Sequence, residues 1–269
     1  PQSYKYQSPL RQIKKRNIMK KITILLVTIL VSITLNAQEY SKSLDGIEWV
    51  KIESKAPIII KTQSKKELTI KGGSALQIPE KAKGLKLVGE GGSDNTNVGY
   101  YVFKEGNSLI VRNLLKSDNG KTTLYLPASQ KIKVISDGLN DMEIEGFTNE
   151  IEASSEITGS ITLRNISGPI TVNSNTGNVE VIFNKVNQSS PISISTATGT
   201  VDVSLPEDTP AELFLESTMG EIYTNFNLSI PDKKGLKAIS SQNVKGVINN
   251  GGVKIQLNSA TGNIYLRKK

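Results

Sequence analysis

Apolar and polar residues alternate along short stretches of this chain, and the alternation predicts β-strands. In TGTVDVSLPED, residues 198–208, Val201, Val203 and Leu205 alternate with polar residues. Every second side chain of a strand faces the same side, so one face of this strand is expected to be buried and the other exposed. No window of about 11 residues or more shows the 3.6-residue periodicity of an amphipathic helix. The pattern therefore predicts an all-β fold with almost no helix.

The part of the chain from about residue 39 to 115 holds several further stretches of this kind. The expected strands are EWVKIES (48–54), PIIIKTQ (57–63), ELTIKGG (67–73), GLKLVGE (84–90), VGYYVFK (98–104) and SLIVRN (108–113). The last two would form a hairpin through Glu105, Gly106 and Asn107. We therefore expect an N-terminal β region over residues 39–115.

Glycines recur at a regular interval in the rest of the chain. They occupy positions 120, 138, 159, 177, 199, 220 and 262, which are 18 to 22 residues apart except for a last gap of 42. Residues two and four positions after each glycine are mainly apolar. A repeat of about 20 residues is typical of solenoids, in which stacked coils bury the inner face that one coil cannot bury alone. The doubled gap includes residues 227–251, where a loop would replace or widen one coil.

A second, weaker glycine position halves the repeat. Gly168 lies midway between Gly159 and Gly177, which indicates two strands and two corners per coil. Glycine would supply the positive φ or the close approach that the corners need. Pro127 and Pro206 would end strands at corners, because proline cannot donate to a ladder of hydrogen bonds. Residues 116–269 are therefore predicted to form a short parallel β-solenoid.

Three segments carry a resemblance to a known family. They are GKTTLYLPAS (120–129), GTVDVSLPEDTPAELFLESTMGEIYTNFNL (199–228) and NNGGVKIQLNSATGNIYLRK (249–268). They resemble the bacterial adhesin-like domain of unknown function called DUF4097, with its Gly-x-Val-x-Val-x-Leu-Pro pass and its closing Thr-Gly-Asn-Ile-x-Leu-x-Lys. The resemblance covers roughly residues 100–269. It implies a right-handed β-solenoid in an exported envelope protein, similar to autotransporter adhesin heads, and it brings no catalytic or binding residues.

The basic charge of the chain is concentrated at its start. Residues 1–37 hold seven of the 33 basic side chains and no acidic one, which leaves 26 basic and 25 acidic residues from residue 38 onward. Residues 19–37 are predicted to be a secretory signal peptide, with a basic start, an apolar stretch at 22–35 and a cleavage site after Ala37. A retained membrane anchor is the alternative. Residues 1–18 are interpreted as an upstream extension without a structural role.

This distribution predicts an exported protein that lies in the periplasm, on the cell surface or outside the cell. The nearly neutral remainder predicts that nucleic acid is not a partner, and no membrane insertion of the mature chain is expected. The chain has no His and no Cys, which excludes His-dependent triads, Cys nucleophiles and zinc sites built from these residues. We therefore predict no catalytic residue, no cofactor and no metal.

Carboxylates leave one enzymatic alternative open. Asp141, Glu143 and Glu145 alternate with apolar residues and should project from one strand in the acidic stretch 141–156. Such spacing fits a glycosidase pair or a Ca²⁺ site, and parallel β-helices host polysaccharide lyases and hydrolases. Arg164 could approach this acidic row from the next coil. The plainer interpretation is a solvated face with surface ion pairs.

Tyrosines offer a second surface candidate. Tyr223 and Tyr265 stand three residues after their glycines, so stacked coils would align them. They would form either a platform for sugars or an aromatic ladder that stabilises the sheet. We therefore predict a non-enzymatic adhesin or binding scaffold whose partner is an envelope protein or a glycan. Open sheet ends would permit self-association, against which the terminal RKK (267–269) would act as a charged stop.

Overall fold

The structure is a computed structural model that describes residues 39–72, 79–116, 122–229 and 242–269. These residues belong to one compact unit, Gln38–Lys269. The predicted signal peptide at 19–37, the segment 1–18 and Gly120 lie outside the described residues. Within the described part, no helix is long and apolar enough to cross a membrane. Its helical content is one 3-10 turn, η1 (Glu80–Ala82).

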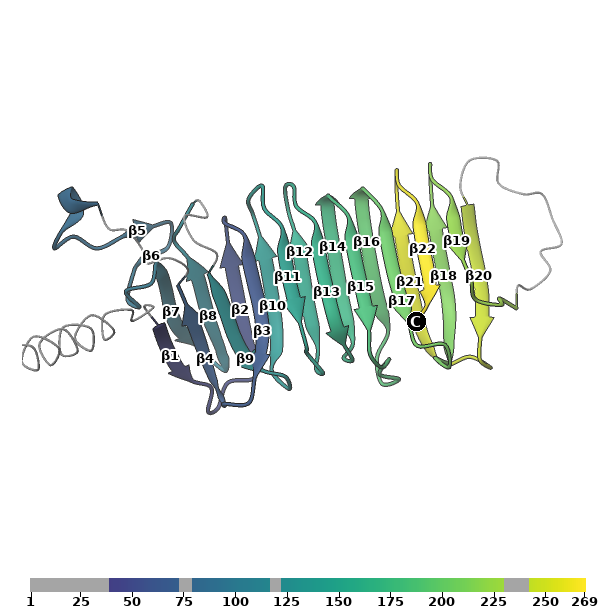
Figure 1. The fold of residues 1–269 in the computed structure, drawn as a ribbon, viewed down its shortest axis with the longest axis horizontal. Coiled ribbons are helices and arrows are strands. Elements are labelled where there is room, and N and C mark those ends of the chain that lie inside the picture. Colours follow the sequence, from purple (N-terminus) through teal and green to yellow (C-terminus); the bar gives the residue numbers. More distant parts are fainter. Residues whose placement is uncertain (1–38, 73–78, 117–121, 230–241) are drawn as a thin grey trace, which may run out of the picture. The chain divides into compact units, whose positions relative to one another are not determined.

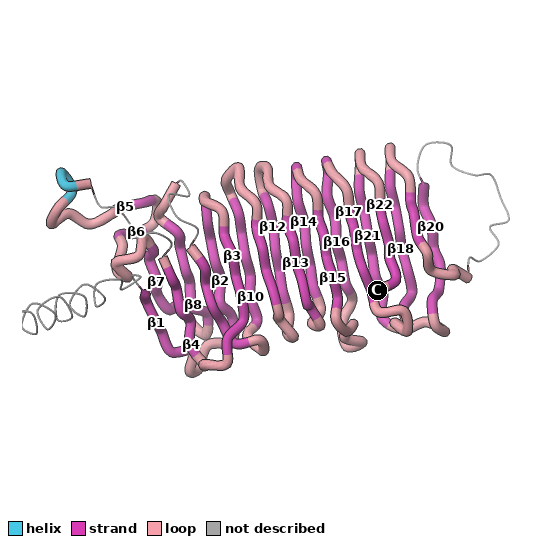
Figure 2. The backbone as a smooth tube through the Cα atoms, in the orientation of Figure 1, coloured by secondary structure: helices cyan, strands magenta, loops and turns pink. Residues whose placement is uncertain are grey.

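Two sheets of ten strands each enclose the core (Figures 1 and 2). In sheet A the order is β1 (Glu39–Ser43), β4 (Glu67–Lys71), β9 (Thr123–Pro127), β3 (Ile58–Gln63), β11 (Met142–Glu145), β13 (Ile161–Ile166), β15 (Val179–Phe183), β17 (Val201–Leu205), β22 (Ile264–Lys268) and β19 (Ile222–Thr224). In sheet B it is β20 (Gln242–Ile248), β18 (Ala211–Ser217), β21 (Val253–Ser259), β16 (Ile192–Thr198), β14 (Ile170–Thr176), β12 (Ile151–Ser155), β10 (Lys131–Ser136), β2 (Trp49–Ser54), β8 (Ser108–Asn113) and β7 (Tyr100–Glu105).

The chain alternates between the sheets, so each coil gives one strand to sheet B and the next strand to sheet A. Neighbouring coils pair in parallel and in register: Ile132 opposes Ile151, and Ile151 opposes Ile170, at steps of 19 residues. The inward residues Val201 and Val203 are fully buried, as the alternation predicts. The all-β solenoid with coils of about 20 residues is confirmed.

The order of the coils in the stack differs from their order in the sequence at two places. The coil of β2 and β3 lies between β8 with β9 on one side and β10 with β11 on the other. The coil of β21 and β22 lies between β16 with β17 and β18 with β19. Residues 39–115 therefore share both sheets with residues 116–269 and do not form a separate layer before them.

The corner glycines are required because neighbouring coils approach closely there. A Cβ on Gly177 would lie 2.3 Å from the Gly159 carbonyl oxygen, and one on Gly262 would lie 1.9 Å from that of Gly199. Gly177 and Gly199 also have φ of +143° and +139°, which side chains with a Cβ rarely adopt. Glycine thus recurs because, at this corner of each coil, its Cα lies against a backbone carbonyl of the neighbouring coil, with no room for a Cβ.

A column of buried hydroxyls runs beside these glycines. The register joins seven of them, all at most 3% exposed: Ser54, Ser136, Ser155, Ser174, Thr196, Ser259 and Ser217. Thr196 donates to the Gly177 carbonyl at 2.9 Å, and Ser259 donates to the Gly199 carbonyl at 2.8 Å. These bonds satisfy corner carbonyls that the strand ladder leaves unpaired. The motif Ser/Thr-x-x-Gly, which the sequence shows at 174–177, 196–199, 217–220 and 259–262, is its signature.

Antiparallel strands close sheet B at both ends and sheet A at one end. In sheet B, β7 pairs with β8 at one end and β20 pairs with β18 at the other. In sheet A, β4 pairs with β9, and β1 pairs with β4. The prediction that RKK stops one end is wrong, because Arg267 and Lys268 lie in β22, inside the stack. Their side chains bind Asp202 and Glu207.

The strand predicted at 84–90 is also largely wrong. Only Val88 and Gly89 form a strand, β5, which pairs with β6 (Gly92–Ser93) in a small separate sheet. Its apolar side chains do not reach the core, since Leu85 and Val88 are 68% and 71% exposed. Alternation alone cannot distinguish such a segment from a strand that has a neighbour to pair with.

Candidate functional site

The acidic residues of the stretch 141–156 lie on the outer face of sheet A. Glu143 and Glu145 project outward from β11, while Met142 and Ile144 point into the core. Asp141 stands just before the strand and accepts a hydrogen bond from the Ser160 backbone N–H at 2.8 Å. Asp141 therefore holds a corner of the next coil.

The basic residue predicted near this row binds elsewhere. Arg164 is in register with Glu145, but its guanidinium forms an ion pair with Glu180 of the following coil at 2.9 Å. Glu145 binds Lys61 at 3.7 Å instead. In the described part of the chain, no three Asp or Glu side chains gather as they would around a metal ion. The acids are thus spread along a face, and of Asp141, Glu143 and Glu145 only Glu145 forms an ion pair among the described residues.

The two tyrosines stack across adjacent coils. Tyr223 of β19 opposes Tyr265 of β22, with ring centroids 5.4 Å apart and an angle of 12° between the planes. Arg267 lies 5.2 Å from the centre of the Tyr265 ring and is held by two hydrogen bonds to the Asp202 carboxylate. That pairing raises the pKa of Arg267 further. Each ring thus has a partner within the sheet, which is the geometry of an aromatic ladder.

A groove with different chemistry lies on the outer face of sheet B. It has a volume of about 520 Å³ and crosses β8, β2 and β10. Trp49, the single tryptophan of the chain, lines it together with Lys51, Asn107 and Ser108. Trp49 is half-buried and sits in register between Ser108 and Lys131. An aromatic ring beside amides and charges is a common composition for a binding site.

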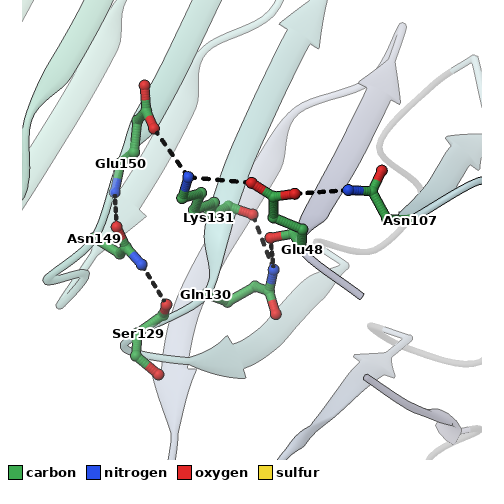
Figure 3. Close-up of polar contacts among 7 residues, drawn as sticks. All are labelled: Glu48, Asn107, Ser129, Gln130, Lys131, Asn149 and Glu150. Atoms are coloured by element: carbon green, nitrogen blue, oxygen red, sulfur yellow. Dashed lines mark hydrogen bonds and ion pairs between the residues drawn. The ribbon is translucent and has the colours of Figure 1, made fainter. Parts of the chain in front are cut away.

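A network of polar contacts fixes one rim of this groove (Figure 3). Glu48 receives hydrogen bonds from Asn107 at 2.6 Å and from Lys131 at 3.3 Å. Lys131 also forms an ion pair with Glu150 at 3.5 Å and lies 5.4 Å from the centre of the Trp49 ring. The hydrogen bond to Glu48 raises the pKa of Lys131 above its usual value. The network draws on four separate segments, so the rim is held from several sides.

Turns behind the rim complete this network. The side-chain amide of Gln130 donates to the Glu48 carbonyl at 2.6 Å, and that of Asn149 donates to the Ser129 carbonyl at 2.9 Å. The Glu150 backbone N–H donates to the Asn149 side chain at 2.8 Å. These bonds tie the turn before β10 to the turn before β12 (Figure 3). The Trp49 side of the groove is thus preorganised by backbone contacts.

A second groove of about 650 Å³ adjoins the first. Glu53 lines both, and its carboxylate binds Arg112 at 2.7 Å. Lys55 and Glu90, which pair at 2.9 Å, line the second groove only. The pair raises the pKa of Lys55 and lowers that of Glu90. Together the grooves follow β2 along its length.

Sequence reasoning missed Trp49. Its strand was expected at 48–54, but the side chain was not singled out. The signal is present in the sequence, because Val50, Ile52 and Ser54 alternate inward and so leave Trp49 on the outer face. A large, half-buried aromatic ring at an outward position of a strand is the kind of group that binding surfaces use.

Comparisons with known proteins show what this chain is similar to. Residues 140–267 match the model of the Toastrack DUF4097 family, which confirms the resemblance seen in the sequence. A "putative cell adhesion protein" from Clostridium sporogenes aligns at 13% identity and a TM-score of 0.43, covering 86% of this chain and 99% of its own. A "putative adhesin" from Bacteroides fragilis aligns at 15% identity and a TM-score of 0.42, covering 86% and 96%. No curated protein matches the chain. Residues 140–267 therefore form a domain similar to the Toastrack DUF4097 family.

Proposed function

We propose that this chain is an exported, non-enzymatic binding scaffold of the cell envelope, adhesin-like in role, that holds a glycan against the outer face of sheet B. The observation that carries the proposal is the groove at Trp49, where an aromatic ring, amides and charges meet on a rigid stack of coils. A solenoid suits such a role because its strands present side chains at a fixed spacing of about 4.8 Å.

The carboxylates support a binding role better than a catalytic one. A glycosidase needs two carboxyl groups facing each other across the scissile bond. Here Glu145, Glu180 and Asp202 each pair with a cation on a neighbouring strand of sheet A, at 3.7, 2.9 and 2.8 Å. Asp141 is engaged by a backbone N–H. None of these groups is arranged as an acid with a facing base or nucleophile.

A screen of the purified protein on an array of bacterial and host glycans tests the proposal, with and without Ca²⁺. Retention of one class of glycan without release of shortened products would support it. Cleavage products, detected by mass spectrometry of the eluted sugar, would contradict the non-enzymatic role. Binding to an envelope protein from the same cells, with silence on the array, would contradict the glycan as partner. Export is tested separately, by recovering a chain cleaved after Ala37 outside the cytoplasm.

A further inference from the structure

We propose that the groove at Trp49 takes an acidic sugar, with the indole against one face of the ring and Lys51 on its carboxylate. This inference rests on the proposed function, because it names the class of glycan that the same groove would bind. It is carried by two independent features: the state of the charges that line the groove, and the position of the single tryptophan.

Each carboxylate that lines the groove is paired with a cation, whereas one of its two lysines has no anionic partner among the described residues. Its three carboxylates each have a cationic partner: Glu48 with Lys131, Glu53 with Arg112, and Glu152 with Lys133, the last at 2.7 Å. Its second lysine, Lys133, is thereby neutralised.

Lys51 is the remaining charge. Among the described residues, its ammonium group has no ion pair and no hydrogen bond. It is half-buried and lies directly opposite Lys133 in the parallel ladder. An ammonium group that is partly withdrawn from water and has no anionic partner is stabilised by an incoming anion. The groove is therefore selective for a ligand that brings a negative charge to this point.

The tryptophan specifies the rest of the ligand. Trp49 lies two residues before Lys51, and outward side chains at i and i+2 of a strand stand about 7 Å apart. A pyranose ring that rests its C–H face on the indole would place a carboxylate on its edge within reach of Lys51. Asn107 and Ser108 line the same side of the groove and offer hydrogen bonds to hydroxyl groups. A uronic acid has this combination of an apolar face, hydroxyl groups and one carboxylate.

Two other anionic classes fit less well. A nucleic acid needs a row of cations along its phosphates, and the groove has one uncompensated lysine. An acidic peptide would satisfy Lys51 but has no flat face of C–H groups for the indole. The single unpaired lysine and the single indole ring match one acidic sugar unit of a glycan.

The test uses the full chain and a matched pair of ligands, hexagalacturonate and its methyl ester. The two ligands share every ring atom, and the ester lacks the charge. Trp49 is the single tryptophan, so its fluorescence reports occupancy of this groove directly. Lys51→Gln should weaken hexagalacturonate binding about tenfold, the loss expected for one charge-assisted hydrogen bond. Lys254→Gln, which removes an exposed lysine from the same face outside the groove, is the control.

We expect the acid to change Trp49 fluorescence and the ester to bind at least tenfold more weakly. Three results would each overturn the inference. They are equal binding of the acid and the ester, an equal loss of binding in Lys51→Gln and Lys254→Gln, and no binding of the acid. Poly-glutamate that competes as well as hexagalacturonate would overturn the sugar as ligand. Because Trp49→Ala removes the reporter, its binding is measured by calorimetry, and a tenfold loss is expected. Glycan retention on the array by Lys51→Gln would leave the proposed function standing and this inference refuted.

Discussion

The column of corner glycines predicts that one added methyl group will disrupt the stack. In Gly262→Ala, the new Cβ would lie 1.9 Å from the Gly199 carbonyl oxygen, whereas real Cβ contacts do not fall below 3.0 Å. The two coils must separate by about 1 Å at this corner. Gly262 has no positive φ, so the cost comes from the contact and not from backbone conformation.

The size of the effect follows from the bonds at that corner. Ser259 donates to the Gly199 carbonyl at 2.8 Å and accepts from the Gly262 N–H at 2.9 Å. A separation of 1 Å breaks the bond between the coils, from Ser259 to Gly199, at about 1 kcal/mol, and forcing backbone into occupied space adds about 1–3 kcal/mol. The free energy of unfolding should fall by roughly 2–4 kcal/mol.

Urea unfolding, followed by circular dichroism and by Trp49 fluorescence, measures this loss. Gly246→Ala is the matched control, because a Cβ there meets its nearest atom, in Leu228, at an ordinary 3.4 Å, and the residue has no positive φ. It should unfold within about 1 kcal/mol of the unchanged protein. If Gly262→Ala is no less stable than Gly246→Ala, the stability of this corner does not depend on the close approach of the two coils.

Three further predictions test other parts of the stack. Ser259→Ala should lower the free energy of unfolding by about 1–2 kcal/mol, because its hydroxyl donates a hydrogen bond. Ser155→Ala should be neutral or stabilising, because the Ser155 hydroxyl is buried and has no hydrogen-bond partner among the described residues. The same urea titration compares the two variants, and equal losses would refute the role of the hydroxyl column. The pKa of Glu90 is lowered by Lys55, so this pair stabilises the fold above the unfolded carboxylate pKa and loses its effect as pH falls through the folded value. The unfolding midpoints of the unchanged protein and Glu90→Gln should therefore differ at pH 7 and converge as the pH falls below the lowered pKa of Glu90, and a difference that does not shrink on acidification would contradict this. The Asn95 side chain makes two 2.9 Å hydrogen bonds to the backbone of edge strand β7 and so covers that edge. Asn95→Ala should expose the edge and make the protein associate as its concentration rises in analytical ultracentrifugation. A monomer at all concentrations would show that the edge needs no such cover.

The local architecture could be predicted from the sequence because it depends on short-range patterns. The alternation at Val201, Val203 and Leu205 defines the buried face, and it is buried. The glycine spacing predicted the coil length for a physical reason. Each coil has a glycine at the same corner, where it contacts the neighbouring coil, so the distance between glycines equals the length of one coil. The hairpin at 98–113 was likewise correct, with β7 and β8 antiparallel and Gly106 at a φ of +59° in the turn.

The order of the stack could not be predicted, because every coil has a similar inner face. In β2, Val50 and Ile52 are as fully buried as Ile132 and Val134 in the neighbouring β10. The alternation therefore identifies the strands of a coil but does not show which other coils they pair with. Residues 39–115 lack the glycine repeat, so their place inside the stack gives no signal at short range.

The candidate site depended on the same missing information. Trp49 and Lys131 are far apart in the sequence, and the groove exists because β2 pairs with β10. The partner of Arg164 also cannot be derived from the strand register alone. Register places it beside Glu145, but its long side chain reaches the next coil.

The two displaced coils change how the fold is completed. In a simple solenoid, each coil is added to the end of the growing stack and can also peel away from it. Here β18 and β19 have no neighbour toward the centre of the stack until β21 and β22, which come last in the chain, are in place. A chain that emerges from its N-terminal side can stack its middle coils early, but its last strands must enter an interior position. Loss of β21 and β22 would therefore leave a gap inside the stack, between β16 with β17 and β18 with β19.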